Sequence, residues 1–309
     1  MNIYREIRRK ITRTLAYRAL LGMRALARVL SRPSALRLGA VLGELGFWLT
    51  PRDRRICRKN LDSVFKNQKS GREKREIALG AYRNLGKSFF EVLQLERYHA
   101  GNMKELVTLK GEEHYKKEFE AGRRVIFCTG HIGNWELLPF GLCVTGCHGA
   151  VMARRVNNEG IDRLTRRMRE HYNVKTIVRD PDIATTRKVI RQIKKPGELF
   201  GIVMDQDTKG VEGIFVDFLG KAAFTMTGPV SLALITGASL IPSFVIRQPD
   251  GHNVIEFHPA VRIRRTRDKA ADIRKYTAEL NRIIGKVILS HPDQWIWMHR
   301  RWKQIPPQG

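Results

Sequence analysis

The sequence predicts an α/β fold with a central mixed β-sheet and helices on both faces. From Arg124 onward, short apolar runs alternate with longer amphipathic segments, an order typical of a sheet covered by helices. The chain has 309 residues, 42% of them hydrophobic, which is enough for a sizeable core. It contains no run of 18 uncharged apolar residues, so we do not predict a firm transmembrane helix.

The N-terminal part is predicted to be helical and strongly basic, with fifteen Lys or Arg against three acids in residues 1–60. In "LAYRALLGMRALARVLS", leucines at roughly helical spacing alternate with arginines. This pattern fits a basic amphipathic helix on a membrane, and equally a helix packed on its own domain with a solvated basic face. Residues 35–49 end in Phe47 and Trp48, as interfacial anchors often do. We therefore expect a membrane-associating segment, 1–50, and an α/β domain with N-terminal helices, 51–309.

The remaining helices and strands are predicted from the spacing of apolar residues and from the residues that end each pattern. Gly101 and Asn102 end one helical pattern, Gly237 ends another, and "KKPGE" closes a third. Helices are expected at 72–98, 112–121, from about 134, and at 158–171, 184–194, 229–236 and 272–289. Strands are expected at 106–109, 125–129, 149–153, 174–178, 199–204, 240–247 and 253–257. In sheets of this kind, ligands gather at the carboxyl ends of the strands.

Charge and cysteine content limit the partners and the compartment. The net charge of +27 predicts a polyanionic partner, which could be nucleic acid, an anionic membrane face or an acidic carrier protein. The four cysteines are too few for a disulfide framework, so we expect a reducing compartment. Cys143, Cys147 and His148 lack a second ligand pair at zinc-finger spacing, and we expect no metal there.

His131 and Glu136 in "VIFCTGHIGNWELLPFG" are candidate catalytic residues. His131 follows a predicted strand, between Gly130 and Gly133. The H-x4-E spacing would place the side chains about 140° apart on one helix, so they meet only if His131 is on the turn and Glu136 on the helix that Asn134 caps. A carboxylate on one imidazole nitrogen makes the other a general base. Alternatively, Glu136 only stabilises the helix N-terminus.

Three further stretches could contribute to a site. Asp205 ends a predicted strand, at the same sheet edge as His131. The arginine-rich helix "IDRLTRRMREHY" could bind phosphate with a stripe that includes Arg166, or could be a solvated face. Thr227 and Gly228 begin a helix whose first amides could receive an anion.

The tryptophans and arginines of "QWIWMHRRW" near the C-terminus suit a membrane interface, lipid headgroups or nucleic-acid bases.

Several blocks, in order and over nearly the whole chain, resemble the bacterial lipid A biosynthesis acyltransferases. These are the late lauroyl and myristoyl transferases of the lysophospholipid acyltransferase superfamily, whose sheet is glycerol-phosphate acyltransferase-like. The similar blocks are "RRICRKNLDSVF", "AYRNLGKSFFEVLQL", "GHIGNWE", "VMDQD", "FLGKAAFTMTGPVSLALITGASLIPSF" and "HPDQWIWMHRRW".

The resemblance implies transfer of an acyl chain from an acyl carrier protein thioester to a hydroxyl of a lipid A precursor. It makes His131 the base, Glu136 its orienting partner and Asp205 an important strand-end aspartate. Arg169 is the best match to the family's essential arginine, with Arg166 as the fallback. We assign substrate binding to Arg166, Asn134, Thr227 and Gly228.

By the same resemblance, acyl carrier protein or coenzyme A carries the co-substrate and no cofactor is needed. The location implied is the cytoplasmic face of the inner membrane, where anionic lipids and the lipid acceptor are partners. The family usually begins with a hydrophobic membrane anchor, but here that segment carries Arg24, Arg28 and Arg37, so we expect a monotopic anchor rather than a full span. Two alternatives remain open: an acyltransferase for another acceptor, such as a phosphatidylinositol mannoside or a lysophospholipid, and a basic nucleic-acid-binding protein. The second lacks any known nucleic-acid-binding motif and leaves His131 and Glu136 unused.

Overall fold

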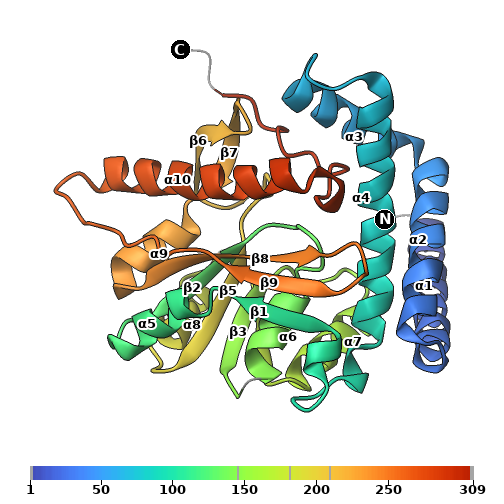
Figure 1. Cartoon of the computed structure of the whole chain (residues 1–309), viewed down its shortest axis with the longest axis horizontal. Helices are drawn as coiled ribbons and strands as arrows, with labels where there is room; N and C mark the ends of the chain where they lie inside the picture. The colour runs from blue at the N-terminus through green and yellow to red at the C-terminus, as the bar shows by residue number, and fades with distance from the viewer. Residues whose placement is uncertain (1–2, 145, 181, 209, 307–309) are drawn as a thin grey trace.

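The computed structural model describes residues 3–144, 146–180, 182–208 and 210–306. Its centre is a seven-stranded mixed sheet in the order β1-β9-β8-β2-β5-β3-β4 (Figure 1). The five strands from β8 to β4 are parallel, while β9 runs antiparallel to β8 and parallel to β1. The strands are β1 (Val107–Lys110), β2 (Val125–Thr129), β3 (His148–Ala153), β4 (Val174–Val178), β5 (Glu198–Val203), β8 (Ser239–Arg247) and β9 (Asn253–Phe257). The predicted α/β class is confirmed.

Helices cover both faces of this sheet, as predicted (Figure 1). One face carries α5 (Glu113–Glu120), α6 (Leu137–Val144) and α7 (Glu159–Glu170), and the other α8 (Ile183–Ile193), α9 (Gly228–Thr236) and α10 (Lys269–Ser290). Alternate residues of β2 supply the two cores, because successive strand side chains point to opposite faces. Phe127 packs in the core on the α6 face, and Ile126 and Cys128 pack in the core on the α10 face.

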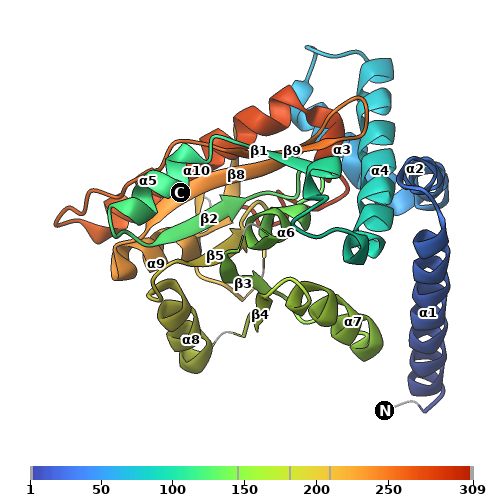
Figure 2. The same ribbon diagram turned by 60° about the horizontal axis from the view of Figure 1, so that its bottom comes forward.

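The N-terminal helices form a separate layer beside the sheet (Figure 2). They are α1 (Ile3–Val29), α2 (Arg32–Leu49), α3 (Pro51–Phe65) and α4 (Gly71–Leu93), and short 3-10 turns lie at Leu95–Arg97, Met103–Glu105 and Pro292–Gln294. Helices α2 and α4 approach closely, because a Cβ at Gly39 would lie 2.5 Å from the carbonyl oxygen of Gly86, and one at Gly43 would lie 2.2 Å from that of Tyr82. Glycine is therefore required on this face of α2.

The opposite face of α2 leaves large apolar side chains exposed. They are Val41, Leu42, Leu45, Trp48 and Leu49. Helix α1 likewise exposes Ile11, Leu15, Leu21, Leu26 and Val29. Within the described ranges, no helix combines the length and the apolar character needed to cross a lipid bilayer.

One antiparallel hairpin, β6 (Gly213–Phe218) and β7 (Lys221–Met226), was not predicted. Its two-residue turn is Leu219-Gly220, and both residues have positive φ, 57° and 78°. Such turns normally carry Asn-Gly or Asp-Gly, because a leucine side chain disfavours this conformation. The usual sequence signal for a hairpin is therefore missing.

The expected interfacial role of the C-terminal tryptophans is wrong for two of the three. Trp295 and Trp297 are 1% and 0% exposed and pack edge to face with ring centroids 4.7 Å apart. Arg301 is also fully buried, and donates to the carbonyl of Phe224 at 2.6 Å. These buried side chains belong to the core and cannot stack on lipid headgroups or nucleic-acid bases.

Candidate active site

His131 lies on a tight turn at the carboxyl end of β2, where the sequence predicts it. Gly133 has φ +60°, and a Cβ there would lie only 1.8 Å from the carbonyl oxygen of Val245 in β8. Only glycine fits such a position. The backbone amide of Gly133 donates to the carbonyl of Gln294 at 2.9 Å. The turn is thus clamped between β8 and the C-terminal segment.

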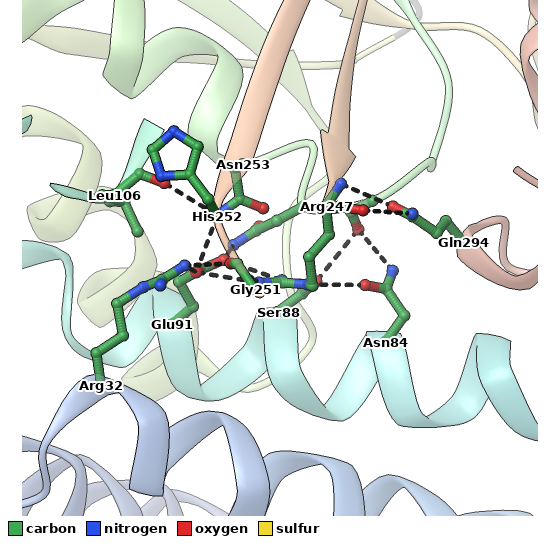
Figure 3. Close-up of polar contacts among 12 residues, drawn as sticks. Arg32, Asn84, Ser88, Glu91, Leu106, Arg247, Gly251, His252, Asn253 and Gln294 are labelled. Carbon is green, nitrogen blue, oxygen red and sulfur yellow. Dashed lines mark hydrogen bonds and ion pairs between the residues drawn. The ribbon is translucent and has the colours of Figure 1, made fainter. Parts of the chain in front are cut away.

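A buried polar network connects this turn to α4, and Figure 3 shows the part of the network around Glu91 and Arg247. The Gly133 carbonyl accepts hydrogen bonds from Asn84 Nδ2 and Ser88 Oγ of α4, both at 3.2 Å. Asn134, the next residue of the turn, donates its side-chain amide to Glu91 Oε2 at 2.8 Å. The turn that carries His131 is therefore fixed to α4 through both its backbone and a side chain.

Glu91 is the centre of the network and is fully buried. Arg247 at the end of β8 donates to its two carboxylate oxygens at 3.1 and 2.9 Å, and Arg32 at the start of α2 donates at 2.6 Å (Figure 3). Burial raises the pKa of Glu91, but the charge and hydrogen bonds of Arg247 lower it more, and the net direction is down. The N-terminal helices, the sheet and the turn that carries His131 are thus joined through one ionised carboxylate.

The imidazole of His131 is bonded to Asp205. Asp205 Oδ1 lies 2.7 Å from His131 Nδ1, and Oδ2 accepts from the His131 amide and from Trp295 Nε1, both at 2.7 Å. Burial would raise the pKa of Asp205, but the charge of His131 and these hydrogen bonds lower it to about 2. An ionised Asp205 holds the proton on Nδ1 and leaves Nε2, 3.3 Å from the Gln206 amide, able to accept a proton.

The expected contact between His131 and Glu136 is not present; among the described residues, Glu136 pairs with Arg169 instead. Arg169 Nη2 and Nε, from the end of α7, donate to the two carboxylate oxygens at 2.6 and 3.1 Å. The helix also begins later than predicted, at Leu137, so Glu136 lies on the preceding turn. Asn134 does not cap it with its side chain, which is bonded to Glu91. The two parallel hydrogen bonds between Arg169 and Glu136 are the strong form of an arginine–carboxylate pair.

A cavity of about 830 Å³ opens at the carboxyl ends of the strands and joins these groups. His131, Glu136 and Arg169 line it, and Trp135 stands edge to face with the imidazole at 4.8 Å between ring centroids. Part of its lining is apolar and comes from the strands and α6, and we call this part the apolar arm. The side chains that line the arm are Phe127, Leu138, Leu142, Val174 and Leu199. The site therefore combines a polar mouth with an apolar interior.

The residues predicted to bind substrate lie outside this cavity, since none is among the described residues that line it. Arg166 pairs with Asp162 at 2.9 Å, and Asn134 is buried in the network. Thr227 is buried and bonds to the carbonyl of Glu212, while Gly228 begins α9.

Three residues around the His131–Asp205 pair were not predicted: Trp135, Gln206 and Trp295. Trp295 fixes Asp205, and Gln206 bonds to the imidazole. The position of Gln206 directly after Asp205 at a strand end was an available signal, whereas nothing local marks Trp295.

Comparisons with known proteins give a consistent result. A family model described as "Bacterial lipid A biosynthesis acyltransferase" matches residues 4–304. The lipid A biosynthesis lauroyltransferase of Escherichia coli K12 is 28% identical, over 89% of this chain and 87% of that protein. The palmitoleoyltransferase of the same strain is 26% identical, over 87% and 85%. A phosphatidylinositol mannoside acyltransferase of Mycolicibacterium smegmatis is 21% identical, over 73% and 71%.

Proposed function

The chain belongs to the bacterial lipid A biosynthesis acyltransferase family, and on that premise we propose that it moves a fatty acyl chain from an acyl carrier protein thioester to a hydroxyl of a lipid A precursor. The observation that carries the proposal is the His131–Asp205 pair at the mouth of a cavity with an apolar arm. A fatty chain requires the arm, and a weakly acidic hydroxyl requires the base.

In the proposed reaction, His131 Nε2 removes the proton from the acceptor hydroxyl as its oxygen attacks the thioester carbonyl. The new C–O bond forms, the C–S bond breaks, and the imidazolium returns its proton to the leaving thiolate. Asp205 stabilises the imidazolium and keeps Nε2 directed at the cavity. No acyl-enzyme and no cofactor are needed, because the thioester is already activated.

Negative charge develops on the carbonyl oxygen, and we assign its stabilisation to Arg169. Three amides of the turn are already occupied: those of His131, Ile132 and Gly133 donate to Asp205, Gly130 and Gln294. Arg169 lines the same cavity and is held by Glu136. In this scheme Glu136 acts on Arg169 and not on the base.

The direct test uses the purified full-length chain with an acyl carrier protein thioester and a lipid A precursor, with mass spectrometry of the products. His131→Ala should abolish transfer, while His148→Ala, which changes an exposed histidine outside the cavity, should retain it. Undiminished transfer by His131→Ala would end the proposed mechanism.

The same assay with other substrates decides the donor and the acceptor. If the enzyme used acyl coenzyme A equally well, the acyl carrier protein could not be assigned as its specific donor. Acylation of a phosphatidylinositol mannoside in preference to the lipid A precursor would favour the activity named for the mycobacterial relative.

We further propose that α1 and α2 bind the cytoplasmic face of the inner membrane without spanning it. Their exposed apolar side chains are interspersed with basic residues, which suits an anionic lipid surface. Trp48→Ala combined with Leu49→Ala should reduce co-sedimentation with vesicles of phosphatidylethanolamine and phosphatidylglycerol. Retained binding to vesicles, or tighter binding to DNA in a gel shift, would contradict this.

A further inference from the structure

Two arginines at the ends of neighbouring strands line the cavity in addition to the pair formed by Glu136 and Arg169. Arg154 directly follows β3 and Arg179 directly follows β4, and both line the cavity that contains His131. The two strands are parallel with Ala153 opposite Val178, and the Arg179 amide donates to the Ala153 carbonyl at 2.9 Å. Arg154 and Arg179 are the next residues in this register, and laterally paired residues of a sheet point to the same face, so both side chains leave the sheet on one face.

Neither guanidinium has a counter-charge among the residues that the structure describes. In the described part of the chain, no hydrogen bond or ion pair joins the side chain of Arg154 or Arg179 to any acceptor. Arg169, which lines the same cavity, is by contrast paired with Glu136.

The remaining acids at the cavity do not neutralise the pair. Asp207 accepts from the amides of Lys303 and Gln304 at 3.1 and 2.7 Å and is committed to the C-terminal segment. Asp53 lines the cavity but forms no ion pair with either arginine among the described contacts.

Arg154 is exposed and Arg179 half-buried, and two like charges held close together are unfavourable unless an anion binds between them. Burial, and secondly the charge of Arg154, lower the pKa of Arg179, which is the cost expected of such a pair. Arginine forks match the oxygens of a phosphate, and a phosphate monoester carries a charge near −2 at neutral pH. Two unpaired guanidinium groups match that charge more closely than the single charge of a phosphodiester.

We infer that Arg154 and Arg179 form a binding subsite for a phosphate monoester on the headgroup of the acceptor lipid. The inference rests on the acyl-transfer function proposed above and names a determinant of its acceptor. Because the subsite and His131 line one cavity, a phosphate held at the rim would position an acceptor hydroxyl for the base.

The kinetic test compares the purified wild-type chain with Arg154→Ala, Arg179→Ala and the double variant. Arg155→Ala is the matched control, because Arg155 is the next residue and equally charged but is not among the described residues lining the cavity. For a phosphorylated acceptor, each single variant should raise KM about tenfold or more, the double variant should raise it further, and kcat should change little. With the dephosphorylated acceptor, all variants should match the wild type.

Two results overturn the subsite. One is an unchanged KM for the phosphorylated acceptor in the double variant. The other is a raised KM that depends on the donor and not on the acceptor. In that case the variants would raise KM with the acyl carrier thioester but not with an acyl N-acetylcysteamine thioester, which lacks the phosphodiester of the carrier.

A binding test separates this inference from the proposed function. Glycerol 3-phosphate, but not glycerol, should raise the unfolding temperature of the wild type and of Arg155→Ala, and should not raise that of the double variant. If the wild type transfers no acyl group but this protection holds, the proposed function fails and the subsite stands. Equal protection of the double variant overturns the subsite even if acyl transfer is found.

Discussion

The Nδ1 atom of His131 lies 2.7 Å from Oδ1 of Asp205, a residue 74 positions later in the chain. The contact follows from strand register. Thr129 of β2 pairs with Val203 of β5, and His131 and Asp205 each lie two positions beyond these partners. Trp295 and the His131 amide fix the other carboxylate oxygen, so the aspartate has one orientation. The imidazole is thereby held with Nε2 toward Gln206, and both residues line the cavity.

Asp205→Asn should reduce kcat/KM by about a hundred- to ten-thousand-fold, the usual contribution of an oriented general base. An amide can donate to Nδ1 and stabilise the wrong tautomer, which leaves Nε2 protonated. Steady-state kinetics on the purified variant measures the loss, and its circular dichroism spectrum shows whether it is folded. A folded Asp205→Asn enzyme with wild-type kcat/KM would show that the pair does not support the base.

The same carboxylate should make stability depend on acid pH. The pKa of Asp205 falls from 3.8 to about 2 on folding, so its charged form stabilises the native state above about pH 4. That contribution, on the order of 2 kcal/mol, is lost as the pH falls toward 2. Urea unfolding of the wild type and of Asp205→Asn between pH 5 and pH 2 should show the difference in unfolding free energy shrinking. A difference that stays constant over this range would contradict the lowered pKa.

Much of the sheet could be predicted because each strand is a local signal. Strands β2, β4 and β9 have the predicted bounds, since short β-branched runs between polar breakers are recognisable without their partners. The hairpin β6–β7 was missed because Leu219 adopts a turn conformation that leucine does not signal.

The pairing of His131 with Asp205 could not be predicted in the same way. His131 and Asp205 were each placed at a strand end, but their contact depends on β2 lying next to β5 rather than next to β3. Strand order is a property of the whole chain. From the sequence, Glu136 is the predicted partner of His131 because it is close in the chain. Arg169 is predicted at the site, but its bond to Glu136, 33 residues earlier, is not.

Glu136 and Arg169 should behave as one unit in catalysis. Glu136→Gln and Arg169→Ala should each lower kcat/KM about ten- to a hundredfold, and the double variant should lower it little more than Arg169→Ala alone. Arg166→Ala is the control, because Arg166 is on the same helix but pairs with Asp162. Additive losses would mean that Glu136 acts independently of Arg169, as it would if it were the partner of His131 that the sequence predicts.

Gly201 should help to set the length of the acyl chain. It lies between Phe127 and Val151 in the sheet and lines the cavity, and a Cβ there would meet only Val151 Cγ1, at 3.4 Å. Gly201→Val should therefore fold and fill part of the arm, so that the preferred acyl chain becomes shorter. Mass spectrometry of products from mixed acyl donors measures the shift, with Ala222→Val on the exposed side of β7 as control. The same distribution in both variants would show that the chain does not pass Gly201.

The network around Glu91 should contribute strongly to stability. Glu91→Ala leaves Arg247 buried without a counter-charge, and the expected loss is about 3–5 kcal/mol in the free energy of unfolding. The combined change Glu91→Leu with Arg247→Met removes both charges and should recover much of that loss, since hydrophobic replacement of a buried pair is often neutral.

A surface ion pair between α2 and α4 provides the control for this network. Glu44 of α2 and Arg83 of α4 are exposed and 2.6 Å apart, and Glu44→Ala should cost at most about 1 kcal/mol. Urea unfolding of the three variants gives the comparison. Asn134 and Gly133 tie the network to the turn that carries His131, so Glu91→Ala should also lower kcat at temperatures where the variant remains folded. Wild-type kcat in a folded Glu91→Ala variant would confine the role of the network to stability.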